Sequence, residues 1–196
     1  MFGNKNRLKC LSNETYTEFF IDITFKLIPK SWRPYKLFTI ATIDFKENKT
    51  ILIGFILFKN MDSETYLRIL KMLNDNFSFN PKVIHTDYES ALDKAIKEST
   101  FFKNKPINLK CFFHFVKAVR NKIMTIEHNK KGLKKEGINI LNNIEIICFI
   151  DLSKMDEYKN FLINEIKKYN KYDSLIKYLK SFWFKKNTFI FRIEYL

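Results

Sequence analysis

Two aspartates, Asp22 and Asp87, are the residues whose types and positions could support chemistry. Asp87 follows a β-branched pair, Val83-Ile84, and precedes residues 89–98, in which apolar and charged residues alternate at helical spacing. It is therefore expected at the carboxyl end of a strand, just before a helix, where open α/β sheets bind their ligands. An aspartate at such a point is also a common helix N-cap, and on Asp87 alone the cap is the more frequent explanation.

Asp22 lies inside an aromatic and β-branched run that predicts a strand over residues 19–25. No cap is needed there, and a buried ionised carboxylate costs several kcal/mol unless it is paired or bound to a metal ion. If the first strand neighbours the fourth, Asp22 and Asp87 come side by side, and a cation such as Mg²⁺ or Mn²⁺ relieves their repulsion. This pattern is typical of two-metal phosphodiester chemistry.

The elements that must position these aspartates alternate in a recognisable order. The expected strands cover residues 19–25, 35–43, 50–59, 83–84 and 107–112. The first expected helix opens at residue 63. The other expected helices cover residues 89–98, 113–124, 130–149, 155–169 and 172–184. A polar turn makes the second and third strands a hairpin, and βα units follow. The pattern predicts an α/β fold, a mixed five-stranded sheet with flanking helices, followed by an all-helical segment.

A change of character near residue 128 suggests the domain organisation. Residues 1–18 are expected to be a loose lead-in, 19–128 the sheet-containing core, and 129–196 a helical region. A short strand pattern at 188–193 is too weak to change this division.

The charge favours a polyanionic partner. The chain carries 35 Lys and Arg against 21 Asp and Glu, a net charge of +14. Solvated surface lysines are the competing explanation. The longest apolar run, residues 51–58, is far shorter than the roughly 18 residues that cross a bilayer. Residues 1–10 lack an apolar signal core, and three widely spaced cysteines form no disulfide framework, so we expect a reducing compartment and no secretion.

Cys111 and His114 form a CxxH pair. Alone, it is a weak zinc signal because a tetrahedral site needs four ligands, and Cys148 and His128 fit no standard spacing. By residue type, Cys111 is expected to be a buried strand residue and His114 a helix-start residue.

Together these segments resemble the MULE (Mutator-like element) transposase domain, of the retroviral-integrase and RNase H-like superfamily. Asp22-Ile23-Thr24-Phe25 is similar to the family's first-acid strand, Asp-Gly-Thr-Phe. Asp87-Tyr88-Glu89-Ser90-Ala91 is similar to its second-acid segment, Asp-Phe/Tyr-Glu-x-Ala. Cys111-Phe112-Phe113-His114 matches its CxxH motif, and a basic helix containing Lys117-Ala118-Val119-Arg120 follows. The likeness covers residues 19–185.

The resemblance implies an RNase H-like core with Asp22 and Asp87 as catalytic, metal-binding acids and Mg²⁺ or Mn²⁺ as the cofactor. DNA is the implied partner, bound in part through Lys110, Lys117 and Arg120 near the site. Assembly with other transposase subunits and a place in the nucleus, or else the cytoplasm, are further expectations. The role of the CxxH pair stays open.

Two departures from the family pattern matter. Ile23 replaces the family's Gly, which could crowd the backbone beside the metal site. The family's third acid, a Glu on a helix after the helical region, has no matching residue here. Glu194 stands in unrelated surroundings, and a helical-segment acid such as Glu165 is an alternative. The third acid is therefore unknown, and the chain is expected to be a fragment or a degenerate copy of a catalytic domain.

Three hypotheses follow. The first is a metal-dependent transposase core that cleaves and joins DNA strands, with its activity as it stands left open. The second is a non-catalytic DNA-binding protein derived from a transposase. The third is a basic α/β domain unrelated to nucleic acid. Between the first two, the expectation is that the chain binds DNA and does not cleave it efficiently, because two carboxylates hold a cation loosely.

Overall fold

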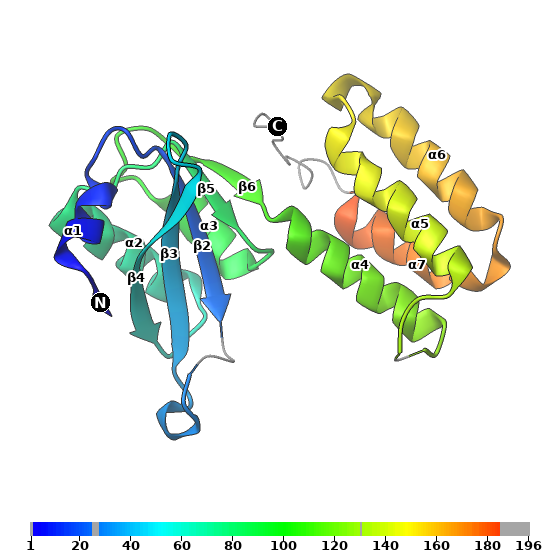
Figure 1. Ribbon diagram of the computed structural model, residues 1–196, viewed down its shortest axis with the longest axis horizontal. Coiled ribbons are helices and arrows are strands. Elements are labelled where there is room, and N and C mark those ends of the chain that lie inside the picture. Colours follow the sequence, from blue (N-terminus) through cyan, green and yellow to red (C-terminus); the bar gives the residue numbers. More distant parts are fainter. Residues whose placement is uncertain (1, 25–27, 130, 185–196) are drawn as a thin grey trace. The chain divides into compact units, whose positions relative to one another are not determined.

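The computed structural model describes residues 2–24, 28–129 and 131–184 (Figure 1). The chain forms two compact units, Met1–Leu109 and Lys110–Leu196. The first unit is rich in strands and the second is helical. The sequence instead placed the change near residue 128, and its limits of 19–128 and 129–196 stay a prediction. The strand pattern at 188–193 lies outside the described residues.

The first unit is built on a mixed sheet with the strand order β1-β4-β3-β2-β5-β6. Its strands are β1 (Phe2–Gly3), β2 (Glu18–Thr24), β3 (Lys36–Asp44), β4 (Lys49–Phe58), β5 (Val83–Thr86) and β6 (Ile107–Lys110). β2 pairs antiparallel with β3 and parallel with β5, and β3 pairs antiparallel with β4. The five strands expected from the sequence are therefore present, and the expected mixed α/β sheet with flanking helices is confirmed.

A sixth strand comes from the segment expected to be a loose lead-in. The two-residue β1 pairs antiparallel with β4, and the short helix α1 (Lys5–Leu8) follows it. Gly3 lies opposite Gly54, and a Cβ on Gly3 would stand only 2.8 Å from the carbonyl oxygen of Ile53. The backbones can approach this closely because Gly3 has no side chain. A polar segment with one such contact has no periodic apolar pattern, so the sequence did not reveal it.

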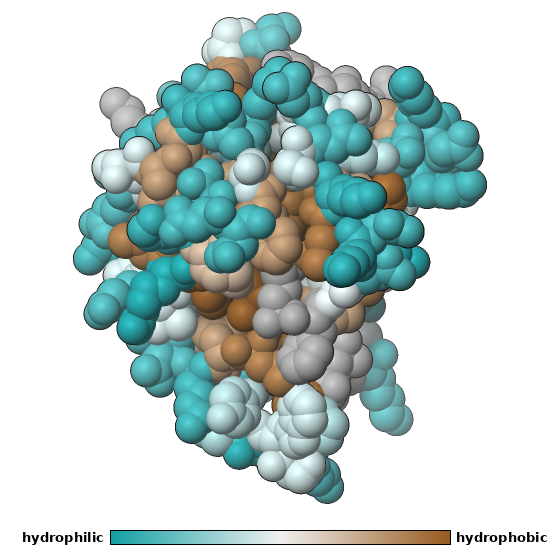
Figure 2. All heavy atoms as spheres, turned by 90° about the vertical axis from the view of Figure 1, so that its left-hand side faces the viewer, coloured by the Kyte–Doolittle hydropathy of each residue, from teal (hydrophilic) through white to brown (hydrophobic). Residues whose placement is uncertain are grey.

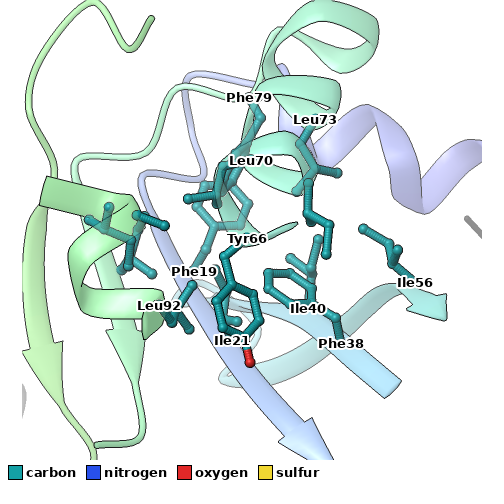
Figure 3. Close-up of a cluster of buried hydrophobic side chains, with 14 of the residues drawn as sticks. Phe19, Ile21, Phe38, Ile40, Ile56, Tyr66, Leu70, Leu73, Phe79 and Leu92 are labelled. Carbon is teal, nitrogen blue, oxygen red and sulfur yellow. The ribbon is translucent and has the colours of Figure 1, made fainter. Parts of the chain in front are cut away.

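The core of the first unit lies between one face of the sheet and two helices (Figure 3). These are α2 (Ser63–Phe77) and α3 (Ser90–Glu98). Phe19 and Ile21 of β2 point into this core, together with Tyr66 and Leu70 of α2 and Leu92 of α3. Alternate residues of β2 are buried, as expected for a strand with one covered face.

The opposite face of the sheet is less covered. Leu37 of β3 and Phe55 and Leu57 of β4 are half-buried there. Figure 2 views the molecule from the side of α1 and β4, at that edge of the sheet, and shows hydrophilic side chains around a smaller apolar area. This second face of the sheet also carries the first of the two candidate acids.

The second unit consists of helices and short helical turns. Its α-helices are α4 (Phe112–Ile126), α5 (Lys135–Glu145), α6 (Met155–Lys167) and α7 (Asp173–Tyr178). The helix expected over 130–149 is shorter, because residues 131–134 are not helical and its last part, Ile146–Phe149, is a 3₁₀ turn; residue 130 is outside the described residues. Across the described chain, none of the helices is long and apolar enough to span a membrane.

Candidate active site

Asp22 is the fifth residue of β2, and its side chain is exposed. The neighbouring Ile21 and Ile23 are only 3% and 6% exposed, because their side chains enter the core. Successive side chains of a strand point to opposite faces, so Asp22 belongs to the face away from the core. The expectation that Asp22 is buried is therefore wrong, since its apolar neighbours occupy the other face. Its carboxylate is held on a strand yet stays within reach of solvent.

Asp87 directly follows the last residue of β5 and is half-buried. The N-cap of α3 is Glu89, whose Oε1 accepts a hydrogen bond from the Ala91 backbone N–H at 3.2 Å. Asp87 instead accepts a 3.3 Å hydrogen bond from the Glu89 backbone N–H through Oδ1. The N-cap explanation of Asp87 is thus wrong. Asp87 lies in the turn between β5 and α3, at the carboxyl end of a strand as expected.

The strand register brings the two acids together. In the parallel pair of β2 and β5, the last matched residues are Ile21 and Thr86. Asp22 is the next residue of β2, and Asp87 is the residue that directly follows β5. Because neighbouring strands lie about 4.8 Å apart, the two backbones are adjacent at the acids. The expected neighbourhood of first and fourth strands is confirmed, and convergence of the carboxylates to within about 8 Å, close enough to share one cation, stays a prediction.

A tightly packed group precedes the acids on the same two strands. The rings of Phe20 and His85 stack with centroids 4.2 Å apart and an interplanar angle of 7°. His85 Nε2 lies 3.1 Å from Glu18 Oε2, so a polar contact also joins β2 to β5. Sequence reasoning missed Glu18 and His85. The available signal was the period of two, which puts Glu18, Phe20 and Asp22 on one face of β2.

A second group fixes the strand that ends at Asp87. Thr86 is 1% exposed, and its hydroxyl donates a 2.9 Å hydrogen bond to Asn108 Oδ1 on β6. Asn108 Nδ2 in turn donates to Asp93 Oδ1 on α3 at 2.8 Å. The residue before Asp87 is thereby tied to both a neighbouring strand and the following helix. No sequence motif links these three residues, so only the fold reveals the network.

The donor set fits a hard divalent cation, since Mg²⁺ and Mn²⁺ prefer oxygen ligands from one or two carboxylates plus water or phosphate. Within the part of the chain that the structure describes, no group of three or more His, Cys, Asp or Glu side chains could hold a metal ion. Asp22 and Asp87 would therefore supply only part of an octahedral shell. Of the alternatives for a third acid, Glu194 lies outside the described residues, and Glu165 belongs to the second unit, where it pairs with Lys168 at 2.5 Å.

The CxxH pair stands between a strand and a helix. β6 ends at Lys110, Cys111 is the N-cap residue of α4, and His114 lies in the first turn of that helix. Cys111 makes no side-chain capping bond and is half-buried. His114 lies at the start of a helix as expected, but the expectation that Cys111 is a buried strand residue is wrong, because β6 ends one residue before it. The role of the pair stays open.

The basic residues of α4 include a lysine that lies beside an exposed aromatic ring. Lys117 and Arg120 are exposed on α4, and neither forms an ion pair with a carboxylate among the described residues. Lys117 Nζ lies 5.7 Å from the ring centroid of Phe113, which is 66% exposed. Exposed aromatic rings beside basic side chains are typical of surfaces on which nucleic-acid bases stack. Sequence reasoning missed Phe113 because a composition so rich in Phe gives little weight to any one ring.

Comparisons with solved structures show low similarity. The chain matches the Drosophila P element transposase strand transfer complex at 17% identity and a TM-score of 0.39, over 96% of this chain and 52% of that one. It thus spans about half the length of that transposase. A fowlpox virus Holliday junction resolvase matches at 16% identity and a TM-score of 0.30, over 84% of this chain and 97% of the resolvase. No curated protein matches the chain in sequence.

The family comparison is more direct. The model of the MULE transposase domain matches residues 19–118, slightly more than half of the chain. This range begins within β2, contains Asp22, Asp87 and the CxxH pair, and ends within α4. The chain belongs to the MULE transposase domain family.

Proposed function

We propose that this chain is the catalytic core of a DNA transposase, in which Asp22 and Asp87 hold a divalent cation for DNA strand cleavage and strand transfer. The observation that carries the proposal is the register of β2 and β5, which makes these acids adjacent at the carboxyl ends of two parallel strands. Membership of the transposase family supports it. So do the oxygen donors, which are the ligands that Mg²⁺ and Mn²⁺ prefer.

The residues divide into three roles. Asp22 and Asp87 bind the cation. His85 joins β5 to β2 through Phe20 and Glu18, and Thr86 joins β5 to β6 through Asn108. Lys117 and Arg120 bind the phosphates of the DNA backbone, for which exposed cations without a carboxylate partner are suited. Divalent cations at such a site activate the attacking oxygen and stabilise the leaving one.

A second candidate function is DNA binding without cleavage. One observation favours it: among the described residues, no group of three or more His, Cys, Asp or Glu side chains could hold a metal ion. Two carboxylates leave a cation loosely placed, and small misplacements of reacting groups cost about 100-fold in rate. The expected behaviour of the chain as it stands is therefore salt-sensitive DNA binding with inefficient cleavage.

Nicking of a labelled DNA duplex in Mg²⁺ or Mn²⁺ separates the two functions. The variants are Asp22→Ala and Asp87→Ala, with Asp75→Ala as a matched control, because Asp75 is exposed on α2 and pairs with Lys71 at 2.8 Å. Weak nicking beside clear DNA binding supports the non-catalytic function. Robust nicking that either site variant abolishes and Asp75→Ala retains shows a complete site, with Glu194 or Glu165 to be tested as its third ligand. Nicking that survives Asp87→Ala contradicts the assignment.

A further inference from the structure

Tyr66 presents an unusual polar atom in the core of the first unit. The residue lies in the first turns of α2 and is 0% exposed. Its hydroxyl is buried, with no hydrogen-bond partner among the residues that the structure describes. A buried hydroxyl without a partner costs stability, and a phenylalanine would fill the same space without that cost. The retained hydroxyl therefore calls for a functional explanation.

The surroundings of this hydroxyl are negatively charged. The ring centroids of Tyr66 and Phe58 lie 5.5 Å apart. The Tyr66 hydroxyl oxygen points along β2 toward the carboxyl end of that strand (Figure 3). Burial, and then the negative charges of Glu89, Asp87 and Asp62, raise the pKa of the Tyr66 hydroxyl far above its usual value. Tyr66 is thus a neutral hydrogen-bond donor, and the carboxylates of Glu89, Asp87 and Asp62 lie near enough to influence its hydroxyl.

Glu89 connects this donor to the acid site. Its side chain caps α3, and its backbone N–H donates the 3.3 Å hydrogen bond to Asp87 Oδ1. Any contact that fixes Glu89 therefore also restrains Asp87. A cation at Asp87 would reduce the repulsion between the Asp87 and Glu89 carboxylates, so that the Glu89 side chain could approach the core.

We infer that Tyr66 is a positioning residue of the acid site: its hydroxyl donates a hydrogen bond to the Glu89 carboxylate when a divalent cation binds at Asp87. Glu89 then holds Asp87 in the orientation that binds the cation. This inference rests on the proposed function. It assigns to the core-facing side of the β5–α3 turn a task that none of the sequence motifs indicated.

The test is calorimetric titration of the full-length chain with Mn²⁺ at neutral pH, together with the melting temperature of each variant. Tyr66→Phe keeps the ring and removes the donor. Glu89→Ser removes the carboxylate and keeps a good N-cap. Tyr158→Phe is the matched control, because its hydroxyl donates to the Asn143 carbonyl at 2.7 Å in the second unit. Asp87→Asn tests the cation site itself.

The expected result is an Mn²⁺ dissociation constant about 3- to 10-fold higher in Tyr66→Phe, as for loss of one hydrogen bond, without a lower melting temperature. In the Glu89→Ser background, Tyr66→Phe should add nothing, and Tyr158→Phe should bind like the wild type. Unchanged Mn²⁺ binding in Tyr66→Phe, while Asp87→Asn abolishes it, overturns the role of Tyr66 and leaves the cation site standing. An additive effect in the Glu89→Ser background also overturns it. Wild-type protein that binds no Mn²⁺, or binds it equally in Asp87→Asn, overturns the cation site and this inference with it.

Discussion

Glu127 is the clearest case in which single residues hold the second unit together. It is only 6% exposed, and its carboxylate accepts hydrogen bonds from the Tyr172 hydroxyl at 2.5 Å and the Lys134 backbone N–H at 2.8 Å. Burial, and then the hydrogen bond to Glu127, raise the pKa of Tyr172, which therefore remains a neutral donor. A buried carboxylate is tolerated because both of its oxygens are hydrogen-bonded. It binds the end of α4 to the segment before α7.

Gly137 is packed against this carboxylate. A Cβ at Gly137 would lie 2.5 Å from Glu127 Oε1 and 2.8 Å from Ile123 Cγ2. We expect Gly137→Ala to destabilise the protein by about 1–3 kcal/mol, because the carboxylate must leave its two donors or the helices must separate. Thermal or urea denaturation measures the loss. Gly132→Ala is the control, because a Cβ there meets nothing within 4 Å. Equal stability of the two variants would contradict this account of Glu127.

At the scale of elements, sequence periodicity was sufficient wherever packing is regular. The strands and helices of the sheet were predictable from apolar runs because one side of each element must be buried. The Asp22 side chain was wrongly expected to be buried, because Ile21 and Ile23 precede and follow it in the sequence. Side chains alternate along a strand, so these two isoleucines lie on the other face of the sheet. The cap of α3 was misassigned by two residues, because Asp87 and Glu89 both have a side chain suited to capping. Strand β1 depends on one close Gly3–Gly54 approach, which leaves no periodic signal.

The start of α2 offers a test of this local chemistry. The sequence predicted a helix that opens at residue 63, and its N-cap is Asp62, whose Oδ1 accepts a 2.7 Å hydrogen bond from the Thr65 backbone N–H. Hydrogen bonds from Thr65 lower the pKa of Asp62. We therefore expect Asp62→Ala to lower the melting temperature at neutral pH, and Ser63→Ala to have little effect.

The pH dependence of that difference follows from the lowered pKa. A carboxyl group with a lowered pKa in the folded state stabilises the fold above its unfolded pKa, here near 3.8. This stabilisation is lost as the pH falls through the folded pKa. The gap in melting temperature between wild type and Asp62→Ala should thus narrow in acid. A gap that is constant from neutral pH to below the folded pKa would show that charge has no part in the cap.

For the molecule as a whole, the net charge is read directly from the sequence, whereas the ion pairs of its basic residues are known only from the fold. The net charge of +14 favoured a polyanionic partner, but only the structure separates basic side chains held by acids from those that are not. Arg68 and Lys71 on α2 pair with Glu64 and Asp75 at 3.9 and 2.8 Å. Which basic residues bind DNA, and which acid completes the cation site, depend on contacts between distant segments and could not be predicted from spacing.

DNA binding by α4 can be tested through its salt dependence. We expect the double variant Lys117→Ala/Arg120→Ala to bind duplex DNA more weakly, because two phosphate contacts are lost. The slope of log affinity against log salt should become shallower by about 1.8, or about 0.9 for each contact. Fluorescence anisotropy over a range of salt concentrations measures this slope.

The matched control is Arg68→Ala/Lys71→Ala, which removes the same two charge types from residues that already pair with acids. It should change the slope far less than the α4 variant. Equal slopes for the two double variants would mean that net charge alone, and not the α4 surface, determines DNA binding.

Asp22 and Asp87 are proposed to share one divalent cation, and anomalous diffraction from crystals soaked in Mn²⁺ can locate this cation. We expect an anomalous peak at the carboxyl ends of β2 and β5, with oxygens of both aspartates at about 2.0–2.6 Å from the cation. Crystals of Asp87→Asn should lack the peak. A peak elsewhere, or carboxylate carbons more than about 8 Å apart in the Mn²⁺-soaked crystal, would contradict the account, because one cation could not then bind both residues.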